Sequence, residues 1–450
     1  MRELSEDTWV VFVSDSHIGG DPGCDGFESP EELEALFEEL AEYAGPTELI
    51  LAGDFFDFLQ IGDVPEAMDR AAVTISRPEY VKLFAALERF RSGERKRVVY
   101  LPGNHDAEMW WNPKIQETLR RRGLVDEFAF SYLASFEAGG KRRILYCEHG
   151  NQLDPANTVE DYGDSLDTPL GHHVVMDFTR RIAPFGEVAR GLDLSEIKMV
   201  YPLVAIPRWI TSRYFYNFLG TVTAYLLLPL LVAYAIYRVI AFLLAVARDD
   251  PAWFLGNYQE LLPVHRLFLD VGFYGLLTLL IFAIFFFVVR RVVQRTVATM
   301  SFKQRTHYSP AESSQNKIRK ILLGEAPPPM DPSVRPEDID VFVSGHTHLP
   351  SLDELETDGV RRVVVNSGCW LRQLQPVSPY LKGPPVFVSK FVLTHVRVFV
   401  QGSSLRVELW EHPKPAEQRL TKIERLLSWN RRPPQPPAGS KPYVRAAATL

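Results

Sequence analysis

Cysteine is scarce in this chain of 450 residues. The three present, Cys24, Cys147 and Cys369, cannot pair into a complete set of disulfides. None of them belongs to a Cys-x-x-Cys pair of the kind that binds zinc or exchanges electrons. We therefore expect buried thiols in a reducing compartment, without a disulfide framework and without a thiolate metal site.

An excess of positive charge is also missing. Lys and Arg together number 49 against 56 Asp and Glu, which gives a net charge of -7. A chain of this sign does not attract the phosphates of nucleic acid at long range, so we expect no nucleic-acid partner. The first residues lack a basic stretch followed by an apolar run, so no secretory signal peptide is predicted.

Short apolar runs that end in polar side chains recur along the chain. The first, residues 10–13, leads into Ser14 and Asp15. Such runs predict buried strands, and stretches with helical spacing of apolar residues, such as 30–43 and 79–90, lie between them. This alternation predicts an α/β fold in which the strand ends carry polar side chains to one edge. The other four runs are 49–52, 98–101, 144–147 and 341–344.

The polar residues that follow these runs are of metal-binding types. They offer carboxylates, imidazoles and one amide, a donor set that suits Mn²⁺, Fe or Zn²⁺. Hydrolysis of a phosphate ester needs a strong nucleophile and positive charge beside the phosphoryl oxygens, and two metal ions about 3.5 to 4 Å apart supply both. We therefore predict two divalent ions, with Mn²⁺ as the first choice. The blocks are Asp15-x-His17, Gly53-Asp54-x-x-Asp57, Gly103-Asn104-His105-Asp106, His149-Gly150 and Gly345-His346-x-His348.

These five blocks, in this order, resemble the calcineurin-like metallophosphoesterase superfamily. A single block occurs often by chance, whereas five in order after five apolar runs very rarely do. The resemblance covers roughly residues 8–155 and 338–411. It implies an α/β fold with a β-sandwich flanked by helices, and a metal-dependent phosphoesterase activity.

The resemblance also implies a role for each polar residue. Asp54 would bridge the two metal ions, and His105 would donate a proton to the leaving oxygen or stabilise charge there. Asp106 would orient the imidazole of His105, and Asp57 would support the site from outside the ligand shell. The remaining ligands that the resemblance implies are Asp15, His17 and His348 for the first ion, and Asn104, His149 and His346 for the second.

Within the superfamily, the sequence resembles the branch that contains UDP-2,3-diacylglucosamine pyrophosphohydrolase. That hydrolase carries a helical lid between the blocks that correspond to His149 and His346, and this chain has a hydrophobic insertion in the same interval. The hydrolase usually has arginine at the position of His105, so we expect a different substrate here. The segments that carry this likeness are 14–20, 53–57 and 365–370.

The middle of the chain contains two long uncharged stretches, 214–237 and 271–289. Each is close to the length of about 20 residues that crosses a bilayer as a helix. We predict an inserted lid over 173–300 with a two-helix transmembrane hairpin at about 214–238 and 268–290. Two core helices of a soluble domain are the alternative, which is disfavoured because both stretches are apolar on every face.

The flanks of this insertion complete the predicted organisation. Residues 1–172 and 301–412 would form the catalytic domain, and 413–450 a short helix and a disordered, proline-rich tail. Arginines flank the outer ends of the hairpin, so we expect an integral membrane protein with its catalytic domain in the cytoplasm. Arg180 and Arg181, in an amphipathic stretch before the hairpin, are candidates to bind an anionic headgroup, although a solvated helix face fits equally well.

These features predict a membrane-associated phosphohydrolase. Its substrate would be a phosphate ester or diphosphate of a phospholipid or another lipid-linked molecule, because the hairpin would hold the metals beside the headgroups. Two alternatives remain open: a membrane-anchored phosphodiesterase for a soluble nucleotide, and a metal-binding scaffold without catalysis. The complete ligand set favours an enzyme, and the sequence leaves the oligomeric state open.

Overall fold

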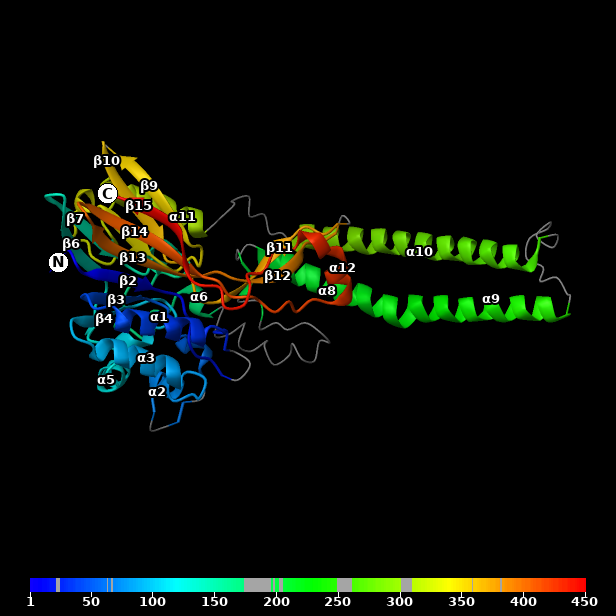
Figure 1. Ribbon diagram of the computed structural model, residues 1–450, viewed down its shortest axis with the longest axis horizontal. Coiled ribbons are helices and arrows are strands. Elements are labelled where there is room, and N and C mark those ends of the chain that lie inside the picture. The colour runs from blue at the N-terminus through cyan, green and yellow to red at the C-terminus, as the bar shows by residue number, and fades with distance from the viewer. Residues whose placement is uncertain are drawn as a thin grey trace.

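Two β-sheets pack face to face at the centre of the main body (Figure 1). This computed structural model describes residues 1–21, 25–62, 64–65, 68–173, 196, 199–201, 205–248, 261–300, 310–357, 359–380 and 383–450. One sheet has the order β15-β14-β13-β2-β3-β4-β5, and the other has the order β1-β6-β7-β8-β10-β9. The architecture fits the predicted β-sandwich.

The strand bounds are as follows. The first sheet contains β2 (Trp9–Val13), β3 (Thr47–Ala52), β4 (Lys96–Leu101), β5 (Glu127–Phe128), β13 (Leu393–Gln401), β14 (Ser404–His412) and β15 (Tyr443–Thr449). The second contains β1 (Arg2–Leu4), β6 (Tyr132–Ala138), β7 (Lys141–Cys147), β8 (Val341–Ser344), β9 (Ser351–Thr357) and β10 (Val360–Asn366).

Strands β2, β3 and β4 are parallel and buried on both faces, which explains their continuous apolar sequences. One face, with Val10 and Ile50, packs against the second sheet, and the other, with Val11 and Leu49, packs against helices. These helices are α1 (Pro30–Glu42), α2 (Arg70–Ile75), α3 (Val81–Ser92), α4 (Glu108–Trp111) and α5 (Pro113–Arg121). Helix α11 (Pro310–Leu322) covers the far face of the second sheet through Ile318 and Leu322.

A smaller unit lies between this sandwich and a projecting hairpin. It consists of the antiparallel pair β11 (Arg372–Val377) and β12 (Val386–Phe391), together with helices α8 (Ile206–Val222) and α12 (Lys422–Leu427). Trp209 on α8 is fully buried against Leu374 and Phe387 of the strand pair. The predicted insertion, 173–300, therefore includes a helix that is packed into the protein.

Two long helices extend from this unit as a hairpin (Figure 1). Helix α8 passes through a π-helical turn, Thr223–Leu227, into α9 (Leu228–Arg248), and α10 (Pro263–Met300) runs back beside it. Helix α9 continues without interruption past residue 238, where the first span was predicted to end. Among the residues that the structure describes, no helix has both the length and the hydropathy required to traverse a bilayer. The predicted transmembrane pair is therefore not confirmed.

The C-terminal segment differs from the prediction of a disordered tail. Residues Tyr443–Thr449 form β15, which pairs with β14 and completes the edge of the first sheet. The proline-rich residues before it have the composition of a tail, but six of the seven residues of β15 pair with residues of β14, and a single sequence does not reveal such distant partners. The short helix predicted in this region corresponds to α12.

A buried pair of histidines lies in β13 and β14, away from the five strand ends that carry the predicted metal ligands. His395 Nε2 accepts a hydrogen bond from Arg397 Nε at 2.7 Å, so its Nδ1 carries the proton and donates to His412 Nε2 at 3.0 Å. Burial, reinforced by the charge of Arg397, lowers the pKa of His412 to about 3. Burial likewise holds the pKa of His395 well below its usual value. Both rings are therefore neutral in the folded protein at pH 7.

This pair predicts a loss of stability in acid. Because the folded-state pKa of His412 is about 3, the unfolded chain, with a histidine pKa of about 6.5, gains protons first as the pH falls. The contribution of the neutral histidine pair to the free energy of unfolding is complete above about pH 6.5. Below about pH 6.5 it should decline by about 1.4 kcal/mol per pH unit for each histidine. Denaturant unfolding of metal-free protein between pH 7 and 4 measures the decline.

His412→Gln is the matched comparison, because glutamine can accept the same hydrogen bond and does not titrate. Its free energy of unfolding should fall less steeply than that of the wild type. Parallel pH profiles for the two proteins would show that His412 does not cause the acid sensitivity.

Candidate dinuclear metal centre

Five strand ends meet at one edge of the sandwich. Strands β2, β3 and β4 of one sheet are parallel to one another, and β7 and β8 of the other sheet are parallel to each other, so the carboxyl ends within each group lie together. The loops that follow these strands carry all five of the predicted blocks. Residues that are more than 300 positions apart in the chain, such as Asp15 and His346, are in hydrogen-bond contact here.

The backbone of these loops is strained at the predicted ligands. Asp15, His17, Asp54, His346 and His348 have φ values of 53°, 49°, 51°, 65° and 57°. Residues with a Cβ rarely adopt this left-handed conformation, and it costs about 1 to 3 kcal/mol at each position. Among the described residues other than glycine, Arg95 is the one further case. Backbone strain of this kind is therefore concentrated at the predicted metal ligands.

Glycines in the blocks permit the close approach of these loops. A Cβ on Gly53, whose φ is +85°, would lie 2.5 Å from the imidazole of His149. A Cβ on Gly103 would collide with the carboxylate of Asp54. The Gly-Asp and Gly-Asn-His-Asp blocks thus need glycine for space at the site itself.

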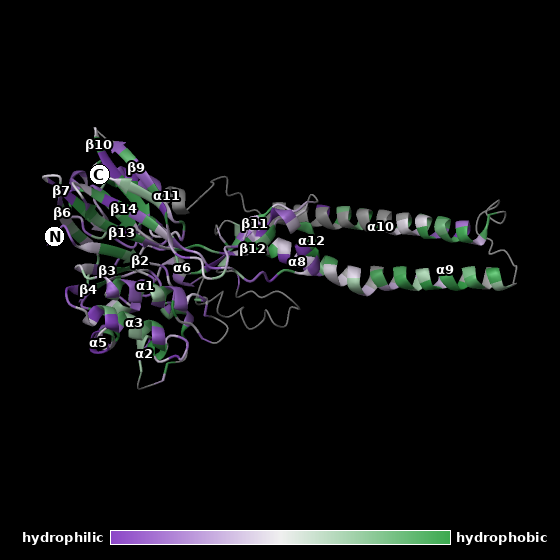
Figure 2. Cartoon of the chain, viewed as in Figure 1, coloured by the Kyte–Doolittle hydropathy of each residue, from purple (hydrophilic) through white to green (hydrophobic). Residues whose placement is uncertain are grey.

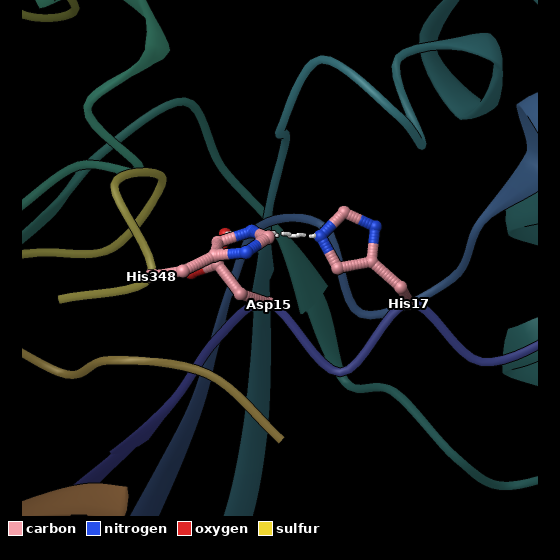
Figure 3. A group of neighbouring side chains, drawn as sticks. All are labelled: Asp15, His17 and His348. Atoms are coloured by element: carbon pink, nitrogen blue, oxygen red, sulfur yellow. Dashed lines mark hydrogen bonds and ion pairs between the residues drawn. The ribbon is translucent and has the colours of Figure 1, made fainter. Parts of the chain in front are cut away.

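The first group of candidate ligands comprises Asp15, His17 and His348 (Figure 3). The Nε2 atoms of His17 and His348 face each other at 3.1 Å, and His348 Nε2 lies 3.2 Å from Asp15 Oδ1. Burial, and next the nearby charge of His105, lowers the pKa of His17 to about 3, so this imidazole offers a lone pair rather than a proton. Neutral imidazole and carboxylate are the forms in which these side chains bind metals.

The second group comprises Asp54, His149 and His346. The Nδ1 of His149 lies 2.8 Å from the carbonyl oxygen of Ala52, and it donates there. This bond directs Nε2 toward Asp54 Oδ2, which is 3.3 Å away. Although burial opposes a charge, the carboxylates of Asp54 and Asp15 raise the pKa of His149 to about 10. Metal binding at this position would displace that proton.

Asp54 lies between the two groups. Its Oδ2 is 3.8 Å from His17 Nε2 and 3.3 Å from His149 Nε2, while its Oδ1 accepts a hydrogen bond from the backbone of His105 at 2.8 Å. One carboxylate oxygen thus faces both groups, as a bridging ligand requires. The bridging role remains a prediction, and the geometry supports it.

Buried polar atoms without partners show that the donor set fits cations. Asp15 Oδ1, Asn104 Oδ1 and His149 Nε2 are buried and make no hydrogen bond of normal geometry; the nearest groups to Asp15 Oδ1 and His149 Nε2 are the other candidate ligands at 3.2 and 3.3 Å. Leaving such atoms unsatisfied costs about 1 to 3 kcal/mol each. Metal ions held by the seven predicted ligands would satisfy all three, since each atom belongs to a predicted ligand.

The imidazole of His105 is held by Asp57 and not by Asp106. His105 Nδ1 lies 3.0 Å from Asp57 Oδ1. Asp106 instead accepts hydrogen bonds from Tyr100 Oη at 2.7 Å and from two backbone amides, those of Gly103 at 2.7 Å and Phe55 at 2.9 Å. Asp106 therefore stabilises the surrounding loops. The contact that orients the ring of His105, which was predicted for Asp106, is made by Asp57.

The electrostatics of His105 suit a proton donor. Burial of the ring disfavours its charged form, but the carboxylates of Asp57 and Asp54 outweigh this and raise the pKa of His105 to about 9. The ring is protonated at neutral pH as a result. Its side chain is also 18% exposed, against 6% for His17, so it can meet a ligand that enters the site.

Two residues near the site were missed by sequence reasoning. Asp154 Oδ2 lies 3.2 Å from His346 Nε2, and the ring of Tyr201 stacks on His348 with centroids 6.3 Å apart. The hydroxyl of Tyr201 also donates to the carbonyl of Thr347. A carboxylate five positions after His149 was a usable signal for Asp154, whereas nothing in the local sequence marks Tyr201. The candidates Arg180 and Arg181 lie outside the described residues.

Comparison with known proteins agrees with the geometry. Residues 8–177 match the family of calcineurin-like phosphoesterases. The match indicates a metal-dependent phosphoesterase, which is a hydrolase. It ends before His346 and His348, which the fold brings to the same edge. No curated protein matches the chain significantly.

Two substitutions should separate metal binding from proton donation. Asp54→Ala removes the oxygen that faces both groups, so the purified protein should lose bound metal and activity together. His105→Ala leaves the seven ligands intact, so metal content should persist while turnover falls by roughly 10² to 10⁴-fold, the usual contribution of a general acid. Elemental analysis and hydrolysis of a chromogenic phosphodiester measure the two properties.

Asp57→Asn is the control for the orienting contact. It should retain metal and lose part of the activity that His105→Ala loses, whereas equal metal loss in all three variants would show that these residues act only by maintaining the fold. Full activity of metal-free Asp54→Ala protein would contradict the dinuclear assignment.

Proposed function

We propose that this protein is a membrane-associated phosphohydrolase that cleaves a phosphate ester or diphosphate bond of a lipid-linked substrate at the cytoplasmic face. The observation that carries the proposal is a physical connection between the candidate metal centre and the apolar hairpin. Tyr201 stacks on His348, and α8, which begins five residues later, leads directly into α9.

The connection is built from well-packed contacts. The backbone amide of Tyr201 donates to the carbonyl of Leu374 in β11 at 2.9 Å, beside the bridge that joins Val200 to the same strand. Trp209 then anchors α8 on this strand pair. The chain just before α8 is thus fixed beside a candidate metal ligand, and α8 leads from there to the apolar hairpin.

The surface of the hairpin supports contact with a lipid bilayer. Figure 2 shows that most of α9 is hydrophobic. Apolar side chains point outward on both helices, and an area of this kind is unfavourable in water and marks an interaction site. The exposed apolar residues include Leu228, Leu231, Ile236, Ile240 and Leu243 on α9, and Phe268, Phe273, Ile281, Ile284 and Phe287 on α10.

The chemistry follows from the residues at the centre. Two divalent ions bound there, Mn²⁺ in the first place, would supply a nucleophile from water and positive charge for the phosphoryl oxygens. Asp15, Asp54 and the other predicted ligands would hold these ions in place. His105, oriented by Asp57, donates its proton to the oxygen of the leaving group. Without this proton, the lipid alcohol or the phosphate would have to leave as an anion.

A diesterase for a soluble nucleotide would have the same centre and would use the hairpin only as an anchor. A scaffold without catalysis would not need a proton donor such as His105, whose ring Asp57 orients at 3.0 Å. We therefore favour an enzyme that acts on a lipid-linked substrate.

Replacement of the outer hairpin tests the lipid substrate. The described contacts suggest a cut that spares α8: Phe218 on α8 stacks with Phe285 on α10 at 6.0 Å, so residues 224–283 can be replaced by a short Gly/Ser linker while this pair is kept. The variant should hydrolyse a small chromogenic phosphodiester at the wild-type rate. It should hydrolyse phospholipid in vesicles at least about tenfold more slowly, because positioning of the substrate is lost.

An artificial lipid anchor on the same variant is the matched control. Under the proposal, tethering leaves lipid hydrolysis low while the small substrate is unaffected. If the artificial anchor fully restored lipid hydrolysis, the hairpin would act only as an anchor. If the wild-type enzyme preferred soluble nucleotides to every vesicle lipid, the diesterase alternative would be supported.

A further inference from the structure

The segment 419–432, which contains α12, is strongly basic within an acidic chain. Its one acidic residue, Glu424, is buried, where it caps α12 through Thr421 and lies 3.5 Å from Arg213 of α8. The positive charges of the segment are therefore not neutralised by it. The basic residues are Arg419, Lys422, Arg425, Arg431 and Arg432.

This basic segment lies at the root of the hairpin. Ile423 and Leu427 of α12 pack against Phe215 and Leu219 of α8, in the last turns before the π-helical turn that begins α9. Figure 1 shows α12 beside α8, where α9 and α10 leave the body. The positive charges thus adjoin the first apolar side chains of the hairpin.

Large side chains on this segment remain exposed. Leu426 is 65% exposed and Trp429 is 66% exposed. Arg431 lies over the ring of Tyr380 at 5.2 Å, and Tyr380 is itself half exposed. Exposed tryptophan and tyrosine next to arginine, beside an apolar helix, form the pattern found at membrane–water boundaries.

A cavity of about 280 Å³ opens beside Trp429. Its lining combines the apolar side chains of Val388, Trp429 and Pro433 with the polar side chains of Gln418, Asn430, Arg432 and Gln435. The Nε of Arg432 is buried and has no hydrogen-bond partner. The Arg432 side chain as a whole is partly exposed and lines the cavity, where its guanidinium group is suited to bind a phosphate through paired hydrogen bonds.

We infer that this cavity binds the phosphate of an anionic phospholipid and that segment 419–432 thereby fixes the base of the hairpin against the membrane surface. Arg432 contacts the phosphate, Trp429 lies at the level of the headgroups, and the other arginines and Lys422 add attraction to the anionic surface. The inference rests on the membrane association proposed above, and it is independent of the substrate. The cavity is formed mainly by residues that precede and follow α12, together with Val388 of β12, and it contains none of the predicted metal ligands.

Flotation of the full-length protein with lipid vesicles tests the site. Binding to vesicles of phosphatidylcholine alone measures the contribution of the hairpin. The additional binding to vesicles that also contain phosphatidylglycerol measures the contribution of the proposed phosphate site. Wild-type protein should float with both and require about tenfold less lipid when phosphatidylglycerol is present, an advantage lost at high salt. Arg432→Gln should lose most of that advantage and leave flotation with phosphatidylcholine unchanged.

Two variants control for charge. Arg419→Gln removes an exposed charge from the same segment but outside the cavity, and Arg432→Lys keeps the charge without the planar donor pair. Arg419→Gln should have a smaller effect than Arg432→Gln, and Arg432→Lys should fall between the wild type and Arg432→Gln. If Arg419→Gln and Arg432→Gln lost the phosphatidylglycerol advantage equally, the attraction would be diffuse, and the assignment of the cavity as a phosphate site would be wrong.

The remaining outcomes are distinct. Failure of the wild type to float with either vesicle would refute the membrane association itself. Equal flotation with both vesicles would refute the anionic site while leaving membrane association intact. Displacement by inorganic phosphate at constant ionic strength, at concentrations similar to those of the lipid, would show a site for free phosphate and overturn the lipid assignment.

Discussion

The burial of two carboxylates side by side is the constraint on which the rest of the site depends. Asp15 and Asp54 are almost fully buried, and each raises the energy of the charged form of the other. Uncompensated buried charges are unstable, so positive charge must be supplied at this edge of the sheet. Histidines supply part of it, and divalent cations would supply the rest. The unpartnered oxygens and the imidazole nitrogen at the centre are consistent with such cations.

The surrounding fold maintains this arrangement at a cost in backbone strain. Five predicted ligands have left-handed backbone conformations, which the strands before them and the opposite loops must stabilise. The stiff sandwich supplies that support from both sheets, since ligands from β2 and from β8 meet through the contact between His346 and Asp15. By contrast, among the described residues α8 packs on the small strand pair β11–β12, and this unit contacts the candidate centre through Tyr201 and through Gln373, whose Nε2 donates to the carbonyl oxygen of His348 at 3.0 Å.

The sequence was informative where chemistry and local pattern coincide. The five strands and the grouping of Asp15, His17 and His348 could be predicted because each ligand directly follows an apolar run. The partner of His105 could not, because the choice between Asp57 and Asp106 depends on how two loops fold onto each other. For the same reason, Tyr201 and β15 were missed: both are defined by contacts with distant residues, Tyr201 with His348 and β15 with β14.

The central claim is that the seven ligands hold two ions with Asp54 between them. Anomalous diffraction from crystals grown with Mn²⁺ tests it directly, because the metal positions are seen without reference to activity. The account predicts two peaks about 3.5 to 4 Å apart, one beside Asp15, His17 and His348 and one beside Asn104, His149 and His346. A single peak, or two peaks that do not share the Asp54 carboxylate, would contradict it.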